Sequence, residues 1–585
     1  MSSRPPAVVA VLVATLAIGG LGATPARSAP DTSCPAPYPV AEVAAGEPVT
    51  GLTVATGTKP QPLTGTVLGV LDDGVAPDID MIMVRLSSRE IDRLGGIWEG
   101  MSGSPVYARD GRLLGAVAYG LSAGPSAVTG LTPAADLESL LDDGPPSGRS
   151  PEHVMLPQQL VRALARTGAA TRQQLNRGLS ALPIPYTVSG LTRGWRVSEA
   201  LLPGSRGNVR VTTAAAGGRA ATEVPIVTGG NVAASVSYGD VTSAGLGTAT
   251  AVCGDQVLAF GHPMNHTGPA TLTMHGATAL GIQDDPTAVP FKLANIAAPV
   301  GVVDQDRLVG LHGVLGDAPE TTDITSVVEM GAKTRTGTTR ISVPDAVPEI
   351  APLHLLADQD RIFDGPGKGS ATLRWTVTGH RVDGSGFSVH RSDRYADPND
   401  LTLLAAADLG DALAAIAATG EATFGSISTH STLSRTYRHY SLGTVQSRVA
   451  GRWITLNANH PLTARAGGTM RIRVRLLSRD LGARWAVLRV PVPRSAAGRA
   501  GSLDVWGANT DLGGEPGGGP GVPPPSDGAP LSKVLERIRT APHNDEVVAS
   551  LNLFRDNGAL LTRTARAATG AVVDGTLSIE VRGTR

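Results

Sequence analysis

The segment that most restricts the fold is residues 95–120, GGIWEGMSGSPVYARDGRLLGAVAYG, where a glycine- and serine-rich loop runs directly into a short hairpin. Residues 105–107 and 113–119 have the composition of strands, and Arg109-Asp110-Gly111 between them is a turn sequence. Ser102 therefore lies between a short apolar segment and a β-hairpin. This order differs from the strand-to-helix elbow that presents the nucleophile of α/β-hydrolases.

The whole chain shares this preference for short strands and turns. Its 585 residues include 72 glycines and 43 prolines, a composition that favours many short strands over helix bundles. The length predicts two to four domains. We therefore expect a mainly β protein, with helices limited to residues 133–141, 156–180 (broken at Gly168), 401–419 and 531–540.

The N-terminus has the pattern of a secretory signal peptide. One arginine precedes the apolar residues 7–21, and small residues follow, with cleavage expected between about residues 23 and 30. Fifteen apolar residues are short for a membrane span. Residues 401–420 come nearest to a later span, but two aspartates interrupt them. We expect an exported protein with no transmembrane segment after cleavage, and the net charge of −1 gives no indication of a nucleic-acid partner.

The chain contains two cysteines, Cys34 and Cys253. In an exported protein such a pair can form a disulfide, which would tie the mature N-terminus to the middle of the chain. Two free or buried thiols are the alternative. The sequence leaves both open.

Changes in composition divide the chain into seven segments. The boundaries come from the proline- and glycine-rich stretches and from the changes between strand and helix patterns. The expected segments are a signal peptide (1–29), a serine-bearing β-barrel half (34–145), a connector with helices (146–208), a histidine-bearing β-barrel half (209–345), a C-terminal β-rich, sandwich-like domain (346–511), a Gly/Pro linker (512–530) and a final helix and β segment (531–585).

Ser102 is the candidate nucleophile of the opening segment. Glycine, serine and proline also form ordinary tight turns, so the loop by itself is weak evidence for catalysis. Its placement before a hairpin would expose it and allow the backbone N–H groups of Gly100 and Ser102 to point into one oxyanion hole. A serine nucleophile also needs a base.

His262 is the candidate base. It follows the second strand of a hairpin that turns at Gly254-Asp255, and it lies between Gly261 and Pro263, where the backbone is constrained. An ordinary hydrogen-bonded histidine is the simpler interpretation. A metal site with His266 and His275 is a weaker alternative, because Pro263 interrupts the spacing and the glutamate of an H-E-x-x-H motif is missing.

Two blocks, GGIWEGMSGSPVYARDGRLLGAV and LAFGHP, resemble the signature blocks of the stage IV sporulation protein B serine peptidases. The likeness covers residues 40–145 and 230–315. It implies an exported enzyme with a trypsin-like double β-barrel, in which Ser102 is the nucleophile and His262 the general base.

The chain departs from that family in three ways. The serine block precedes the histidine block, an order that a circular permutation would explain, since catalytic triads depend on geometry and not on chain order. The family's aspartate, fifteen residues before the serine, is replaced by Ser87. Asp306 is the preferred substitute and Asp80 the alternative. No clear PDZ segment separates the two blocks.

The predicted function is an exported serine endopeptidase that acts on a protein or peptide substrate and needs no metal or organic cofactor. The alternative is an inactive, peptidase-like secreted scaffold, which the missing aspartate favours. A cell-envelope adhesin is a weaker third hypothesis, suggested by the β-rich end and the Pro/Gly linker.

Overall fold

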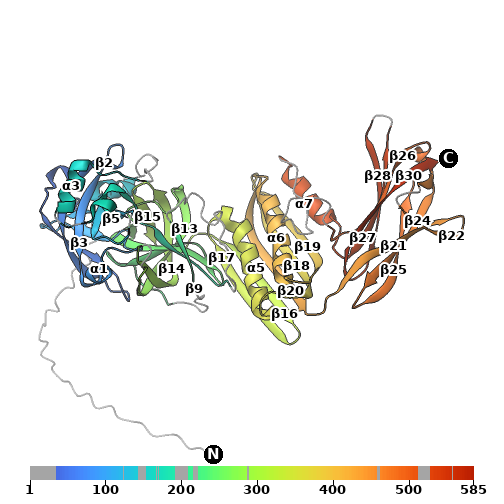
Figure 1. The fold of residues 1–585 in the computed structure, drawn as a ribbon, viewed down its shortest axis with the longest axis horizontal. Helices are drawn as coiled ribbons and strands as arrows, with labels where there is room; N and C mark the ends of the chain where they lie inside the picture. Colours follow the sequence, from blue (N-terminus) through green and yellow to red (C-terminus); the bar gives the residue numbers. More distant parts are fainter. Residues whose placement is uncertain are drawn as a thin grey trace, which may run out of the picture.

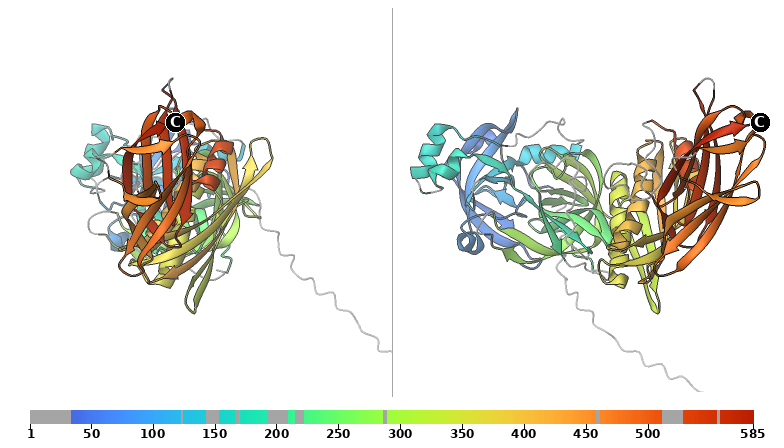
Figure 2. Two further views of the ribbon diagram at one scale, coloured as in Figure 1. Left: turned by 90° about the vertical axis from the view of Figure 1, so that its right-hand side faces the viewer. Right: turned by 45° about the vertical axis from the view of Figure 1, so that its right-hand side comes forward.

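The computed structural model describes residues 34–122, 124–142, 153–166, 168, 170–191, 209–214, 222–285, 289–457, 461–510, 528–555 and 558–585. Within them the chain is mainly β, as expected, and its strands form four sheets. Two strand-rich units lie side by side at one end, a layer with helices follows, and two facing sheets end the molecule (Figures 1 and 2). Among the described residues, no helix has both the length and the apolar character needed to span a bilayer.

The first sheet closes on itself as a barrel. Its order is β4-β1-β2-β3-β6-β5, and the pairing of β4 with β5 joins the two ends of this row, while β7 extends β5. Trp98, Met101 and Leu131 pack in its apolar core. The strands are β1 Pro48–Thr53, β2 Gln61–Ala76, β3 Ile79–Ser87, β4 Pro105–Tyr107, β5 Leu113–Leu121, β6 Val128–Pro133 and β7 Leu179–Ala181. The helices are η1 Val40–Glu42, α1 Arg89–Leu94, α2 Ala134–Glu138, η2 Ser139–Asp142, α3 Gln158–Arg166 and α4 Arg172–Asn176.

Six strands of the second sheet form another closed circuit. Their order is β10-β13-β14-β15-β12-β11, and the pairing of β10 with β11 completes it. Strands β8 and β9 extend the sheet beyond β11, and β17, β16, β20, β18 and β19 extend it beyond β10. The circuit and the first extension consist of β8 Ile184–Ser189, β9 Val209–Ala214, β10 Asn231–Gly239, β11 Thr242–Cys253, β12 Gln256–Ala259, β13 Gly268–Gln283, β14 Phe291–Arg307 and β15 Gly310–Leu315.

The second extension carries the helical layer. Strand β16 pairs in parallel with β20, and one apolar core unites these strands with three helices. The strands are β16 Thr322–Met330, β17 Lys333–Ile341, β18 Gly369–Arg381, β19 Gly386–Asp397 and β20 Ala422–Ser434; the helices are η4 Pro344–Ala346, α5 Val347–Phe363, α6 Leu401–Ala417 and α7 Leu531–Thr540.

Two five-stranded sheets form the C-terminal sandwich and share one apolar core. The first sheet has the order β22-β21-β24-β25, with β29 on β21, and the second has the order β23-β30-β26-β27-β28. The elements are β21 His439–Val449, β22 Arg452–Thr455, β23 Leu462–Arg465, β24 Thr469–Ser478, β25 Gly482–Pro491, η5 Arg494–Ala496, β26 Ala500–Gly507, β27 Glu546–Phe554, β28 Leu560–Ala568, β29 Val572–Asp574 and β30 Thr576–Thr584.

The two six-stranded circuits touch through a small apolar cluster. Ala116 of β5 and Leu137 of α2 pack there against Ala251 of β11 and Leu258 of β12. Every residue of β5 is buried, because side chains on both of its faces contact apolar clusters. This contact places the serine-bearing loop beside the histidine-bearing hairpin.

The observed sheets cross the segment boundaries expected from composition. Strand β8 belongs to the expected connector but pairs with β11, and β16 and β17 of the expected histidine-bearing half continue into the helical layer. Strands β27 and β30, beyond the Gly/Pro linker, pair with β26 before it. Strand pairing is non-local, so composition alone does not reveal it. The expected signal peptide and most of the linker lie outside the described residues.

Helices form at the expected positions, and the break at Gly168 falls between α3 and α4. Helices α1 and α5 are the exceptions, and α5 begins at Pro348 and its neighbour, in the segment predicted to be a β-rich domain. That proline occupies the first turn, where its missing N–H has no intrahelical partner. Pro352 lies inside the continuous helix, but most α5 side chains are buried, so packing outweighs the low propensity of proline.

Candidate active site

The loop that carries Ser102 is held in a left-handed conformation at two glycines. Gly100 and Gly103 both have φ of +93°. A Cβ atom on Gly103 would lie 1.9 Å from the carbonyl oxygen of Thr248, so only glycine allows the loop to approach β11 this closely. The composition of the loop therefore reflects its docking against the second circuit.

Strand β11 holds this loop by three hydrogen bonds. The N–H of Thr248 donates to the carbonyl of Ser102 at 2.8 Å, and its hydroxyl donates to the carbonyl of Gly100 at 3.0 Å. The hydroxyl of Thr250 donates to the carbonyl of Gly103 at 2.8 Å. In the other direction, a threonine of β6, Thr132, donates to the carbonyl of Gly261 at 2.6 Å. The serine and histidine loops are thus each anchored to the other circuit.

A tight turn at the end of β12 directs His262 toward the serine. Phe260 has φ of +68°, and the N–H of Gly261 donates to the carbonyl of Ala259 at 2.9 Å, which closes a three-residue turn. A bulky residue rarely adopts this conformation, and each such residue costs on the order of 1–3 kcal/mol. The buried Phe260 ring packs over Gly247, where a Cβ atom would lie 2.5 Å from the ring. Packing therefore holds the strained turn in place.

The structure brings Ser102 and His262 together. Ser102 Oγ lies 2.8 Å from His262 Nε2, and His262 Nδ1 lies 2.9 Å from the carbonyl oxygen of Pro263. A carbonyl only accepts hydrogen bonds, so Nδ1 carries the proton and Nε2 accepts from the serine hydroxyl. This is the tautomer that a general base for Ser102 requires.

Both side chains are almost completely buried, each with 1% of its surface exposed. This corrects the expectation of an exposed serine loop, and the reason is that the loop lies between the two circuits. Burial lowers the pKa of His262 to about 4, against the opposing effect of its hydrogen bond to Pro263. The imidazole is therefore neutral at pH 7, which suits a proton acceptor.

Asp306 contacts the backbone that follows His262 and not the histidine ring. Its carboxylate accepts hydrogen bonds from the N–H groups of Met264, at 2.9 Å, and Asn265, at 2.7 Å. Burial raises the pKa of Asp306, and these backbone donors oppose that rise. The carboxylate thus holds the turn whose Pro263 carbonyl orients the ring, and the direct orienting group is this carbonyl.

The other residues considered for the acid lie elsewhere. Asp80 accepts a hydrogen bond from the N–H of Asp73 in the β2–β3 hairpin. Ser87 donates to Asp92 of α1. Neither has a contact with His262 among those that the structure gives for the described residues. The backbone carbonyl of Pro263 therefore occupies the position beside His262 Nδ1 that a carboxylate takes in a catalytic triad.

The backbone of the serine loop offers two N–H groups. The N–H groups of Met101, Gly103 and Ser104 donate to backbone carbonyls. Within the described part of the chain, no acceptor bonds to the N–H groups of Gly100 and Ser102. These are the two groups that the sequence predicts for an oxyanion hole.

Lys292 lies next to this loop and was not predicted. It is 2% exposed, its N–H donates to the carbonyl of Glu99 at 3.0 Å, and its Nζ donates to Asn231 Oδ1 at 2.9 Å. A Cβ atom on Gly100 would lie 3.1 Å from Lys292 Cβ. Burial lowers the pKa of Lys292 to about 7. A single lysine within the apolar pattern of residues 291–303 is the signal that could have revealed it.

Cys34 and Cys253 are joined by a disulfide, with Cα atoms 4.9 Å apart. Cys253 ends β11, the strand that holds the serine loop. The bond therefore links the segment before the first barrel to the hairpin that ends at the histidine turn.

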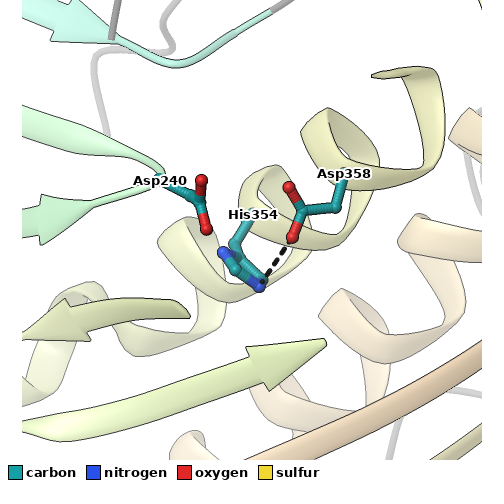
Figure 3. A group of neighbouring side chains, drawn as sticks. All are labelled: Asp240, His354 and Asp358. Carbon is teal, nitrogen blue, oxygen red and sulfur yellow. Dashed lines mark ion pairs between the residues drawn. The ribbon is translucent and has the colours of Figure 1, made fainter. Parts of the chain in front are cut away.

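The described residues contain one cluster with the geometry of metal ligands, Asp240, His354 and Asp358 (Figure 3). Two arginines already neutralise it: Arg335 pairs with both aspartates, and Arg361 lies 3.1 Å from Asp240. The cluster is better explained as an ion-pair network that joins the β10–β11 turn to α5. His275, from the metal alternative, bonds instead to Ser235 Oγ.

The site thus consists of a buried serine and histidine from two six-stranded circuits, with the proton on Nδ1 and two backbone N–H groups nearby. In comparisons with known proteins, no family model, no curated protein and no solved structure matches the chain.

Proposed function

We propose that this protein is an exported serine peptidase with a trypsin-like double barrel, built in permuted order relative to the stage IV sporulation protein B peptidases that its two blocks resemble. One observation carries the proposal: Ser102 Oγ lies 2.8 Å from the unprotonated nitrogen of His262. The two residues are 160 positions apart and come from different strand circuits. A structural role requires neither a nucleophile nor this tautomer.

In the proposed reaction, Ser102 Oγ attacks the carbonyl carbon of a peptide bond while its proton passes to His262 Nε2. The N–H groups of Gly100 and Ser102 stabilise the oxyanion. His262 then gives the proton to the leaving amine, which leaves an acyl group on Ser102. Water attacks the ester with His262 as base, and the acid product and free serine result.

Asp306 would act as a positioning residue. A dyad without a carboxylate on Nδ1 must keep the ring oriented by other means, since the wrong tautomer is unable to accept the serine proton. The Pro263 carbonyl orients it here, and Asp306 fixes the following two N–H groups.

Export agrees with the disulfide, because such bonds persist in oxidising compartments. The expected signal peptide lies outside the described residues. A secreted peptidase of this type requires no cofactor for the steps above.

A secreted binding scaffold is the second candidate, and the burial of the site favours it. With 1% of each side chain exposed, a substrate carbonyl reaches Ser102 only after covering residues move. In a scaffold, the Ser102–His262 hydrogen bond would simply join the two circuits.

Hydrolysis of a peptide mixture, followed by mass spectrometry, separates the two candidates. The peptidase predicts new peptide termini with the wild type and none with Ser102→Ala or His262→Ala. Ser104→Ala is the matched control: it is equally buried, its hydroxyl bonds to Thr53, and it should keep activity. Equal cleavage by wild type and Ser102→Ala would refute the proposal, and so would no cleavage of any peptide by the folded wild type.

A further inference from the structure

Four strands of the C-terminal sandwich are rich in arginine. Strands β21, β22, β24 and β25 form most of one sheet at the end of the molecule remote from the barrels (Figure 1). They contain seven arginines and neither aspartate nor glutamate. The whole chain, by contrast, carries a net charge of −1. Positive charge is therefore concentrated locally in a nearly neutral protein.

Alternation along the strands places most of these arginines on the outer face. In β24 the even-numbered positions from 470 to 476 are buried in the sandwich core, so Arg471, Arg473 and Arg475 face outward. Arg489 of β25 is paired with Arg471, and Gln446 of β21 is paired with Arg473. Arg448, two residues beyond Gln446, therefore lies on the same side. We call these five residues, Arg448, Arg471, Arg473, Arg475 and Arg489, the arginine face.

The charges of this face are not balanced within the described chain. Arg471 and Arg489 lie directly opposite each other, and like charges at such positions destabilise a sheet. Arg471 Nε is buried and has no hydrogen-bond partner among the described residues. None of the five arginines has an ion pair with a described residue. A bound anion would relieve both the repulsion and the missing hydrogen bond.

Two tryptophans hold the central arginine. The Arg473 guanidinium lies 4.4 Å from the ring centre of Trp453 and 4.3 Å from that of Trp485, and its Nε donates to Gln446 at 2.7 Å. Trp485 is 40% exposed and Val487 beside it 48% exposed. The face therefore combines fixed cations with exposed apolar surface.

We propose that the arginine face binds an acidic polysaccharide. Guanidinium groups bind carboxylate or sulfate in a two-pronged geometry. On β24 they repeat about every 6.8 Å, twice the rise of one strand residue, which suits a linear polymer with regularly spaced acid groups. The C–H faces of sugar rings can pack on Trp485 and Val487. A bilayer is less suitable, because Arg473 holds the tryptophan rings against the sheet.

Binding is tested with the full-length mature protein and immobilised polygalacturonate, with dextran as the neutral control. The proposal rests on the proposed export, where such polymers are encountered, and not on peptidase activity. We expect binding to polygalacturonate that weakens steeply with salt, and no binding to dextran. Vesicles of anionic phospholipid and single-stranded DNA are measured in parallel. Stronger binding to either one, or no binding to polygalacturonate at low salt, overturns the proposal.

The substitution test removes three arginines from one sheet at a time. The triple variant R471Q/R475Q/R489Q should bind polygalacturonate at least tenfold more weakly. R563Q/R566Q/R582Q is the matched control: these exposed arginines lie on β28 and β30 of the other sheet, and binding should stay within twofold of wild type. Equal losses in both triples would show a non-specific charge effect and refute the proposal. If the first triple fails to fold, R475Q and R489Q are measured singly, each with an expected loss above twofold.

Discussion

Acidification should test the environment of His262 directly. Burial lowers the pKa of this histidine from 6.5 to about 4. A difference of roughly 2.5 units corresponds to about 3 kcal/mol by which the folded state disfavours the protonated ring. Because the folded-state pKa is depressed, this contribution to stability is complete above pH 6.5. It is lost progressively as the pH falls from about 6.5 to about 4.

The assay is the titration of the twelve histidines, selectively labelled with ¹³C and followed by NMR, combined with urea unfolding between pH 7 and pH 4. The His262 resonance, identified because it is missing from the spectrum of His262→Gln, should titrate near pH 4. That variant should also lose about 3 kcal/mol less stability than wild type over this range. His275→Gln is the matched control. Burial likewise lowers the pKa of His275 to about 4, so this variant should lose a different resonance that also titrates near pH 4. A midpoint near 6.5 for His262 would refute the reasoning.

Three further predictions follow from the contacts of the site. Ser102→Ala leaves the buried Nε2 of His262 without a donor and should cost about 1–3 kcal/mol in urea unfolding, well above the cost of a surface substitution. Replacing Cys34 and Cys253 by serine should lower the free energy of unfolding by up to about 5 kcal/mol, because the bond spans 219 residues; an unchanged value would contradict this. Burial lowers the pKa of Lys292 from 10.5 to about 7 in the folded state. As the pH rises from about 7 to about 10, the free energy of unfolding of the wild type should therefore increase by up to about 4 kcal/mol relative to that of Lys292→Met. A difference between the two proteins that stays constant with pH would contradict the burial of this amine.

Local patterns in the sequence were sufficient for much of the candidate site. The glycines around Ser102 and the Gly-His-Pro frame of His262 are short-range signals, and the structure places both residues at the ends of the expected hairpins. The burial of the pair was not predictable, because it depends on the docking of two circuits. The role of Asp306 was missed for a similar reason: the chain shows a carboxylate, but not that backbone N–H groups take up both of its oxygens.

The domain boundaries and the arginine face illustrate a different limit. Composition separates segments at glycine and proline, whereas hydrogen bonding joins β16 to β20 and β26 to β27 across those boundaries. The net charge of −1 likewise does not predict the arginine face, because it sums over the whole chain and β24 and β25 contain arginines but no acidic residue. Alternation along β24 would have separated its outward arginines from its core residues, but the neighbouring strands are known only from the fold.

The most direct test of the central claim is labelling of the mature protein with a fluorophosphonate, followed by mass spectrometry of its peptides. A nucleophilic Ser102 predicts one phosphonylated residue, in the peptide that contains residues 95–120, with labelling abolished by Ser102→Ala, suppressed by His262→Ala and retained by Ser104→Ala. The reagent enters the site as a substrate carbonyl would, so it also tests whether the buried pair becomes accessible. No labelling of the folded wild type between pH 6 and pH 9, together with a partner protein that co-purifies equally with wild type and Ser102→Ala, would contradict the peptidase and support the binding scaffold.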